Sequence, residues 1–382
     1  MLMAKQITDK LSITEAQALC FRNRVPFYTY RLPGSEEVVF GAQLSNDTHL
    51  FQGFTRHSLG KGFIMTPFNP ASWSFPYFIK ADISFTNELS NKADLTALRN
   101  TVFDTPLRDV VKHELDHKEY LEVVRRLIST IKRESLKKVV FSRTLTIPGE
   151  AYNRAPLLFE RVKRYRQAFL FMVFIPGKSA WLGATPETFL KYDRDGFKTM
   201  ALAGTQPVAT ASNPVVWNKK EMEEQQIVTD YIREVLSPIF TRHLEQEKPI
   251  TLQAGNVYHL CTRFNSDEQL PADEIDHLIS QLHPTPAVCG LPRKRAMQLI
   301  ADMELQERGY YAGLLGPVQH NGAFDLFVNL RSVELFNEAY KLYAGGGITS
   351  LSDPEKEWQE TCQKADTLMS LIQEIEKEGV RI

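Results

Sequence analysis

The chain has 382 residues, of which 43% are hydrophobic and 24% charged, so it holds enough apolar material for one large globular domain or two or three ordinary ones. Its 45 basic and 46 acidic residues give a formal net charge of -1, so no basic excess marks nucleic acid or an anionic membrane as partner. No run approaches the roughly 20 apolar residues that span a bilayer, and Met1–Lys10 lacks the apolar core of a signal peptide. The four scattered cysteines are typical of reduced thiols, so we expect a cytoplasmic protein.

Residues 1 to about 115 have the pattern of sheet material with long connections. A short helix is expected at Ile13–Cys20. Strands bounded by prolines and glycines are expected at Val25–Arg31, Val38–Ala42, Gly62–Thr66 and Pro76–Ile83. This part of the chain shows no catalytic constellation.

The middle of the chain alternates helices and apolar strands. Helices are expected at His117–Lys132 and Leu157–Tyr165, and strands at Lys137–Leu145, Phe169–Ile175, Ser179–Leu182, Thr188–Tyr192 and Thr199–Leu202. The uninterrupted apolar run Phe169–Ile175 is typical of a strand buried on both faces. Lys138 lies at the entrance of its strand and is either a solvated edge residue or functional. Glu187 follows a proline between two strands and faces either a cleft or solvent.

A carboxylate meets an apolar stripe in the helix expected at Asn218–Leu236. Glu224 lies four residues before Val228, on the line of that stripe. A buried carboxylate must be paired, protonated or bound to a metal, because burying a lone charge costs several kcal/mol. Alternatively, Glu224 faces water or stabilises the N-terminus of the helix.

The following segment is expected to contain strands at Asn256–Thr262, Tyr310–Pro317 and Phe324–Leu335 and helices at Ile275–Leu282 and Arg293–Glu304. Arg331 would lie in the middle of the last strand, where a buried arginine needs a carboxylate from the protein or from a substrate. A zinc site is the alternative for the four metal-binding residue types found here, His259, Cys261, His283 and Cys289. Their spacings match no ordinary zinc pattern.

Near the C-terminus, the apolar run Leu342–Thr349 is expected to enter a three-glycine turn, after which a helix begins near Ser352. Ser352 and Glu355 have the spacing of a capping box. In that helix Glu357, Glu360 and Lys364 project from one side, next to the apolar face. Carboxylates beside a glycine-rich turn suggest a site for a cation and an anionic ligand, and the alternative is a solvated face with an ordinary Glu360–Lys364 ion pair.

Ten sequence blocks, in order, resemble the chorismate-utilising enzymes, a group that includes isochorismate, salicylate, anthranilate and aminodeoxychorismate synthases. The blocks are KVVFSR (138–143), GATPE (183–187), ALAGT (201–205), the acidic helix around Glu224, HLCT (259–262), LHPTPAVCG (282–290), ERGYYAG (307–313), NLRSVEL (329–335), AGGGI (344–348) and DPEKEWQETCQKA (353–365). Each block alone is weak, but ten in order are very specific. The first hundred-odd residues match only loosely.

The resemblance implies an α/β fold of the α+β type, a single large chorismate-binding domain in which two β-sheets pack together with helices on the outside. Residues 1–115 would contribute to the sheets, and residues 116–382 would form the core that carries the active site. The resemblance also implies Mg²⁺, held by Glu224 and Glu360 with Glu357 nearby and linked through water, bridging to a carboxylate of chorismate.

The resemblance assigns further residues to the substrate. Arg331 and Tyr311 would hold the enolpyruvyl carboxylate. Backbone N–H groups of Gly345 and Gly347, with Lys364, would hold the other anionic end, where glycine lets the backbone approach closely. Gly204 and Thr205 would line the ring, and Ala287 lies in a block that varies between branches of the family.

Two positions bear on the attacking group. The resemblance implies that Lys138 marks the branch that uses water, in which a lysine acts as general base once its buried ammonium group loses its proton. Glu187 would then protonate the departing C4 hydroxyl, which requires a desolvated carboxyl. Ala287, where salicylate and anthranilate synthases commonly have threonine, favours isochorismate as the product. Gln225 and Gln206 depart from the histidine and arginine common in the family.

These features predict a Mg²⁺-dependent conversion of chorismate to isochorismate, with salicylate formation by pyruvate elimination as the nearest alternative. An ammonia-using enzyme with a glutaminase partner and a non-catalytic binding protein on the same fold are more distant alternatives. We expect a monomer without a glutaminase subunit. Menaquinone biosynthesis is the expected pathway, with a siderophore pathway as the alternative, because nothing in the chain points to siderophore assembly.

Overall fold

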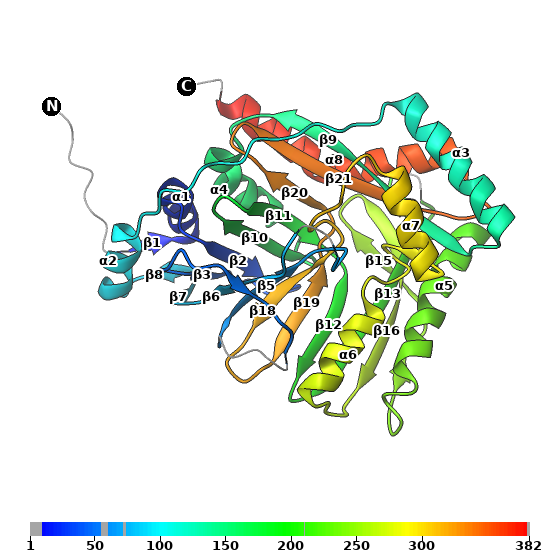
Figure 1. The fold of residues 1–382 in the computed structure, drawn as a ribbon, viewed down its shortest axis with the longest axis horizontal. Coiled ribbons are helices and arrows are strands. Elements are labelled where there is room, and N and C mark those ends of the chain that lie inside the picture. Colours follow the sequence, from blue (N-terminus) through cyan, green and yellow to red (C-terminus); the bar gives the residue numbers. More distant parts are fainter. Residues whose placement is uncertain (1–9, 55–59, 72–73, 210, 380–382) are drawn as a thin grey trace.

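Two large antiparallel β-sheets organise the chain in the computed structural model, which describes residues 10–54, 60–71, 74–209 and 211–379 (Figure 1). The residues before Lys10, most of the segment from which we predict the absence of a signal peptide, lie outside the described part. The expected fold class, two packed sheets with helices outside, is confirmed. Among the described residues, no helix is long and apolar enough to cross a membrane.

One sheet has nine strands. Their spatial order is β17 (Gly290–Leu291), β9 (Lys138–Pro148), β21 (Ala339–Ile348), β20 (Ser332–Leu335), β11 (Ser179–Thr185), β10 (Phe169–Ile175), β2 (Phe27–Arg31), β3 (Val39–Ala42) and β7 (Ile83–Thr86). The predicted hairpin of β10 and β11 is present.

The other large sheet has ten strands. Nine follow one path, β14 (Glu245–Gln246), β16 (Val257–Ser266), β13 (Gly196–Pro207), β12 (Thr188–Asp193), β19 (Phe324–Val328), β18 (Leu314–Val318), β5 (Gly62–Thr66), β6 (Tyr77–Lys80) and β4 (His49–Leu50), and β15 (Ile250–Ala254) pairs with β16. A separate pair joins β1 (Leu11–Ser12) to β8 (Glu88–Leu89). Strands from residues before 115 form one end of each large sheet, and the division of the fold at that residue stays a prediction.

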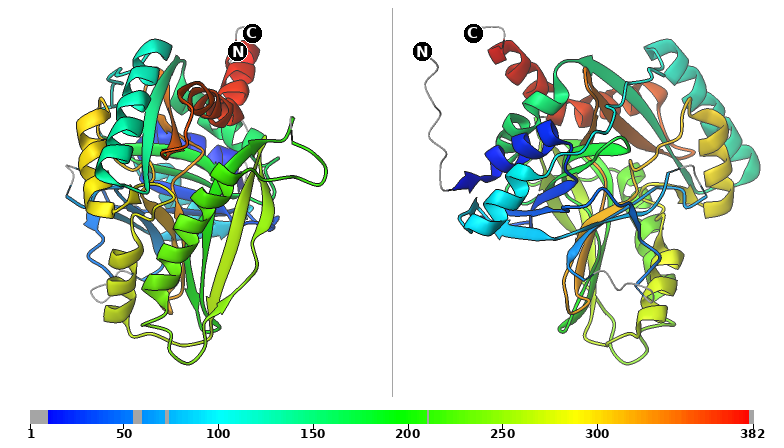
Figure 2. Two further views of the ribbon diagram at one scale, coloured as in Figure 1. Left: turned by 90° about the vertical axis from the view of Figure 1, so that its right-hand side faces the viewer. Right: turned by 60° about the vertical axis from the view of Figure 1, so that its left-hand side comes forward.

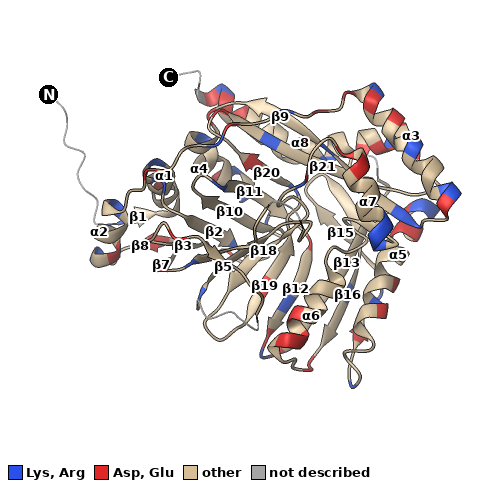
Figure 3. Cartoon of the chain, viewed as in Figure 1, with Lys and Arg blue, Asp and Glu red and all other residues tan. Residues whose placement is uncertain are grey.

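Eight helices lie on the outside of the sheets in the described part of the chain. They are α1 (Ile13–Asn23), α2 (Lys92–Asn100), α3 (His117–Glu134), α4 (Ala151–Val162), α5 (Lys219–Leu236), α6 (Ala272–Leu282), α7 (Arg293–Met303) and α8 (Pro354–Gly379). The turned views show α5 lying along β13 and β16, while α8 packs on β21 (Figure 2). Their charged residues carry both signs intermixed, in keeping with the net charge near zero (Figure 3).

The core has two layers because β10 is buried on both faces. Phe169 on its inner face stacks on Phe327 of the other sheet, with ring centroids 3.8 Å apart. Phe174 on its outer face packs with Phe21 of α1 and Tyr152 of α4. Burial on both faces explains why this strand is apolar at every position.

Two connections carry the chain from one large sheet to the other at the same place. Between β11 and β12 the connection contains Glu187, and between β19 and β20 it contains Arg331. The Ala184 N–H donates to the Arg331 carbonyl (3.1 Å) and the Val328 N–H donates to the Glu187 carbonyl (3.1 Å), so the two crossings support each other. The prediction of one strand over Phe324–Leu335 is therefore wrong. Arg331 lies in a crossing with a φ of 49°, not in mid-strand.

The prediction of a three-glycine turn is also wrong. Gly345, Gly346 and Gly347 lie inside β21 and pair with β9. Glycine is needed there for close approach. A Cβ on Gly347 would lie 2.3 Å from Glu224 Oε1, and one on Gly346 would lie 3.0 Å from Glu357 Oε2. The carboxylates of Glu224 and Glu357 can therefore approach β21 this closely only because these positions of the strand carry no side chain.

The start of α8 also differs from the predicted capping box. The Asp353 carboxylate accepts from the Lys356 N–H (3.0 Å), as an N-cap does, while the Ser352 hydroxyl accepts from the Thr349 N–H (3.0 Å). Glu355 instead pairs with His117 at 3.0 Å. The correct element is present, but its cap is one residue later than predicted.

Candidate active site

A cavity lies where the two crossings meet β21, β13 and α8. Its walls include all eight residues predicted to contact the substrate, namely Gly204, Thr205, Ala287, Tyr311, Arg331, Gly345, Gly347 and Lys364. Glu187 and Glu224 also line it. Lys138 and Glu360 lie directly behind the wall, because Lys138 contacts Glu224 and Glu360 contacts Lys364. The structure thus brings together residues from opposite ends of the chain.

Glu187 supplies a protonated acid to this cavity. Its side chain is almost fully buried, with 3% of the residue exposed. Burial raises the pKa of Glu187 to about 8, even though the Lys138 and Lys364 ammonium groups act in the opposite direction. A carboxyl with a pKa above neutrality holds its proton at pH 7 and can donate it to a leaving group.

Lys138 is fully buried and its Nζ lies 2.8 Å from Glu224 Oε1. The alternative of a solvated strand residue is therefore wrong for Lys138, and the alternative of a water-facing Glu224 is wrong as well. Burial opposes ionisation of Glu224, but Lys138 and Lys220 overcome it and hold the pKa of that carboxyl below its ordinary value. The pair brings a lysine nitrogen and a carboxylate together at one wall.

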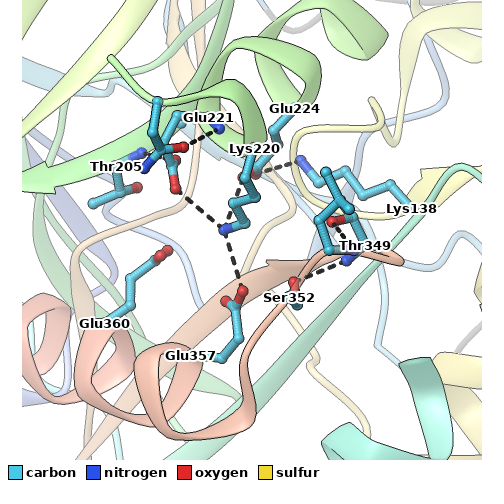
Figure 4. Close-up of polar contacts among 12 residues, drawn as sticks. Lys138, Thr205, Lys220, Glu221, Glu224, Thr349, Ser352, Glu357 and Glu360 are labelled. Carbon is cyan, nitrogen blue, oxygen red and sulfur yellow. Dashed lines mark hydrogen bonds and ion pairs between the residues drawn. The ribbon is translucent and has the colours of Figure 1, made fainter. Parts of the chain in front are cut away.

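The acidic side chains gather around a second lysine. Lys220 Nζ lies 3.1 Å from Glu357 Oε1, 3.4 Å from Glu221 Oε1 and 3.5 Å from Glu224 Oε2 (Figure 4). The pKa of Lys220 is raised because these carboxylates outweigh the effect of its burial. Lys220 and Glu221 were not predicted from the sequence. Lys220 lies four residues before Glu224, a spacing that is common for ion pairs on a helix surface and so gives no sign of a buried cluster.

This cluster provides a test of whether the residues fit Mg²⁺. Oxygen ligands from carboxylates are the type that Mg²⁺ prefers, and Glu357 Oε2 is buried without a hydrogen-bond partner among the described residues. Lys220 already shows that the cluster requires a compensating cation. With the side chains as they stand, no three acidic, histidine or cysteine residues in the described ranges are grouped as a ligand set. The donor types and charge therefore fit the ion, while the metal ligands stay a prediction.

Glu360 forms the predicted ion pair with Lys364, at 2.6 Å, but not on a solvated face. The side chains are 14% and 17% exposed, and Lys364 also donates to the Gly345 carbonyl (2.8 Å). Despite burial, the Lys364 and Lys220 charges keep the pKa of Glu360 below its ordinary value. The ion pair expected for a solvated face is therefore present, but it lies at the wall of the cavity, where the other alternative had expected a binding site.

Arg331 presents an unsatisfied cationic donor. Its Nη1 is buried without a hydrogen-bond partner in the described part of the chain, while Nη2 lies 3.1 Å from His259 Nε2. His259 Nδ1 lies 2.8 Å from the Gly204 carbonyl. Burial lowers the pKa of His259 to about 3, so the ring is neutral, with its proton on Nδ1 and its Nε2 accepting from Arg331. Burial also lowers the pKa of Arg331, to about 10, which leaves the guanidinium charged at neutral pH.

The zinc alternative does not hold, because its histidines bind elsewhere. His259 contacts the Gly204 carbonyl and the Arg331 guanidinium, and the His283 Nε2 lies 3.1 Å from the Phe68 carbonyl. All four cysteines are free thiols. Gln225, at the position of the family's histidine, donates to the Ala201 carbonyl (3.1 Å) below the cavity.

Residues 78–373 match the family described as "Chorismate binding enzyme", and the chain belongs to this family. Among curated relatives, it is 27% identical to the isochorismate synthase EntC of Escherichia coli K12 over 314 residues, which cover 80% of this chain and 79% of that one. It is 31% identical to the isochorismate synthase MenF of the same organism over 277 residues, covering 69% and 62% of the two chains. The crystal structure of the menaquinone-specific MenF from E. coli superposes with a TM-score of 0.76 at 23% identity, over 95% of this chain and 93% of that chain.

These relatives define the class more narrowly. The chain is an enzyme of the chorismate-utilising type, similar to isochorismate synthases. The family resemblance inferred from the ten sequence blocks is confirmed. The roles of individual residues stay predictions that rest on the geometry described above.

Proposed function

We propose that this enzyme converts chorismate to isochorismate. The observation that carries the proposal is a protonated carboxyl, Glu187, in the wall of the cavity, together with a buried lysine, Lys138, that Glu224 holds directly behind that wall. Such a pair of groups with opposite tasks is what an acid–base reaction requires.

In the proposed reaction the oxygen of a water forms a bond to ring carbon C2, the C4–oxygen bond breaks, and the ring double bonds shift between them. Lys138, without its proton, accepts a proton from the water, and Glu187 donates its proton to the departing hydroxyl, which leaves as water. The atoms balance, because one water enters and one leaves. Arg331, through its unpartnered Nη1, and Tyr311 would hold the enolpyruvyl carboxylate.

Lys364 and the N–H of Gly345 would meet the other end of the substrate. A Cβ on Gly345 would lie 3.4 Å from the Tyr311 hydroxyl, so the two residues lie close together in the wall of the cavity. The ring would rest against Gly204, Thr205 and Ala287, which are uncharged and line the same cavity. A small side chain at Ala287 supports release of isochorismate without pyruvate elimination.

Glu224 and Glu360 would hold Mg²⁺, with Glu357 nearby through a water. When bound, the ion would neutralise the ring carboxylate of the substrate and act as a Lewis acid toward it. Glu224 also fixes Lys138 at 2.8 Å, so one side chain would serve both the metal and the base. The family is generally dependent on Mg²⁺, which supports this part of the proposal.

We place the reaction in menaquinone biosynthesis, supported by the match to MenF and by the lack of any sequence feature of siderophore assembly. We further propose that the enzyme acts as a monomer without a glutaminase subunit, which Lys138 supports. Restoration of menaquinone in a bacterial strain that lacks its isochorismate synthases would test the pathway, and analytical ultracentrifugation would test the monomer.

The activity is tested by incubating the purified enzyme with chorismate and Mg²⁺, with and without ammonium, and separating the products by liquid chromatography. Isochorismate alone, approaching an equilibrium mixture and abolished by EDTA, is the expected result. Salicylate with pyruvate would contradict the interpretation of Ala287. Anthranilate or an aminodeoxy product would contradict that of Lys138, and no product from folded protein would favour a binding role.

A further inference from the structure

A second cavity adjoins the active-site cavity. It shares two wall residues, Pro186 and Arg331, with the active site. Three arginines, Arg164, Arg166 and Arg331, line this second cavity, and no acidic residue of the described chain does. We call it the arginine vestibule. Its lining is of one charge sign, although the whole chain is nearly neutral.

The loop that carries Arg164 and Arg166 follows α4 and is held in place by its backbone. Arg31 donates from Nη1 to the Lys163 carbonyl (2.9 Å) and from Nη2 to the Tyr165 carbonyl (2.7 Å). The Gly34 N–H donates to the Arg166 carbonyl (2.9 Å). Three carbonyls among the four residues 163–166 are therefore anchored to β2 and the residues after it. The positions of the two arginines are built into the fold.

The opposite side of the vestibule is fixed in the same way. The Tyr165 hydroxyl donates to the Thr367 carbonyl of α8 (3.0 Å), and the Thr367 hydroxyl donates to Asn256 Oδ1 (3.1 Å) in the β15–β16 hairpin. The Asn256 side chain in turn donates to the Gln363 carbonyl (3.0 Å). These bonds join the loop, the helix and the hairpin around the cavity. Thr367 lies three residues after Lys364 of the active site on the same helix.

The outer arginines are available to a solute. The side chains of Arg164 and Arg166 are 48% and 75% exposed, and their carboxylate contacts are long, 4.0 Å to Glu374 and 3.6 Å to Glu36. Exposed pairs of this kind contribute little energy and are screened by salt. Positive charge therefore continues from the exposed arginines to buried Arg331 at the shared wall.

Another route into the active site would pass Arg308 and Tyr343, which line both the active-site cavity and a further, much smaller cavity. That route is closed by a fixed ion pair, because the Arg308 guanidinium lies 2.6 Å from Glu304 and also donates to the Val140 carbonyl (2.9 Å). The vestibule has no such pair across it. Of these two neighbouring cavities, the vestibule is the larger and the one whose charge suits an anion.

We propose that the arginine vestibule is the entry path of the dicarboxylate substrate, where Arg164 and Arg166 capture the dianion and pass it to Arg331. A cleft lined by one sign of charge raises the local concentration of the opposite ion and its rate of association by about 10- to 1,000-fold. This inference rests on the proposed function, which supplies the dicarboxylate. The two outer arginines act on arrival of the substrate and have no part in the chemical step.

The test measures association of chorismate with a Glu187→Gln background, which binds without turnover, by stopped-flow tryptophan fluorescence at low ionic strength. Trp181 packs on Tyr343, a wall residue of the active site, with ring centroids 5.3 Å apart, and can report occupancy. The vestibule variant carries Arg164→Gln and Arg166→Gln. Its matched control carries Arg125→Gln and Arg126→Gln, two exposed arginines of α3, so that both variants lose the same charge.

We expect the association rate constant of the vestibule variant to fall about tenfold below that of the control, the lower end of the range for focused charge. The dissociation rate constant should fall with it, so that Kd changes less than either rate. Raising the ionic strength to about 0.15 M should slow the control and bring it close to the vestibule variant.

Equal association rate constants in the two variants, with normal affinity, would overturn the entry path and leave the proposed function intact. An unchanged association rate with faster dissociation would also overturn it, because the arginines would then belong to the final binding site. A second chorismate bound per chain, found by calorimetry, would make the vestibule a resident anion site instead. Failure of chorismate to bind even the background with all arginines would overturn the proposed function, and the entry path with it.

Discussion

Replacing Glu187 with glutamine should abolish most activity and yet stabilise the protein. Glutamine keeps the size of the side chain but has no acidic proton, so turnover should fall by roughly 100-fold or more, the scale of general acid–base catalysis. In the wild type, kcat/KM should fall as pH rises through about 8, because burial raises the pKa of Glu187 to about 8 and the reaction needs its protonated form. The variant should lack this alkaline limb.

The stability change follows from the same raised pKa. In the unfolded chain Glu187 has its ordinary pKa of 4.5, against about 8 in the fold. The folded state therefore holds the proton more tightly, and this stabilisation is complete below about pH 4.5 and is lost progressively as pH rises through about 8. At pH 7 the pH lies about 2.5 units above the ordinary pKa of 4.5, so Glu187 would be ionised in the unfolded chain but is still protonated in the fold. At 1.36 kcal/mol per unit, keeping it protonated lowers the free energy of unfolding by an amount on the order of 3 kcal/mol. Glutamine does not carry this cost.

Denaturant unfolding of both proteins between pH 5 and 9 measures the effect. The free energy of unfolding of the glutamine variant should increasingly exceed that of the wild type as pH rises, with little difference near pH 5. The same change at Glu334, a buried carboxyl paired with Arg108 at 2.6 Å and not part of the active-site wall, is the control for activity and should keep the alkaline limb. A constant difference between wild type and Glu187→Gln at every pH would refute the reasoning.

Three further variants test the opposite wall. Lys138→Ala should reduce turnover by roughly 100-fold or more while chorismate still binds in equilibrium titrations, and near-normal turnover would remove Lys138 from the base role. Glu360→Ala should weaken Mg²⁺ binding by at least about tenfold in calorimetry, on the scale of a lost metal-orienting group, so unchanged affinity would show that another residue holds the ion. Gly347→Ala should cost activity on a similar scale with a well-folded circular dichroism spectrum, because its Cβ would lie 2.3 Å from Glu224 Oε1 and 2.5 Å from Lys138 Cε. A fully active alanine variant would show that the close packing at this strand is dispensable.

The sequence predicted elements well wherever their signal was local. The helix expected at Asn218–Leu236 is α5 (Lys219–Leu236), and the strand Phe169–Ile175 is correct at both ends. Pro76–Ile83 was read as one strand, but the chain turns between β6 and β7, which pair in different sheets. The periodicity of apolar residues indicates which face of an element is buried, but it does not indicate which sheet the element joins.

The errors at the site have the same origin. Three consecutive glycines are compatible with a turn and with a strand that carboxylates must approach, and only the position of Glu224 beside Gly347 decides between them. Lys220 has the spacing of an ordinary helix-surface pair with Glu224. Its role as counter-ion depends on Glu357, which reaches it from another helix 137 positions later in the chain.

The location of the site is explained by the two conditions that the proposed reaction sets for its ionisable side chains, namely burial and compensating charge. An acid that stays protonated at neutral pH must be desolvated, and the same desolvation is tolerable for Lys138, Arg331 and Glu224 only if opposite charges meet them there. No single helix or strand can supply both burial and compensation. The point where the chain crosses between two packed sheets can, because Glu187 and Arg331 arrive there on adjacent crossings while β9 and α5 bring Lys138 and Glu224 from either side. Charges that would destabilise any one element are therefore held together by the fold as a whole, and the proposed active site lies at a place where both sheets contribute.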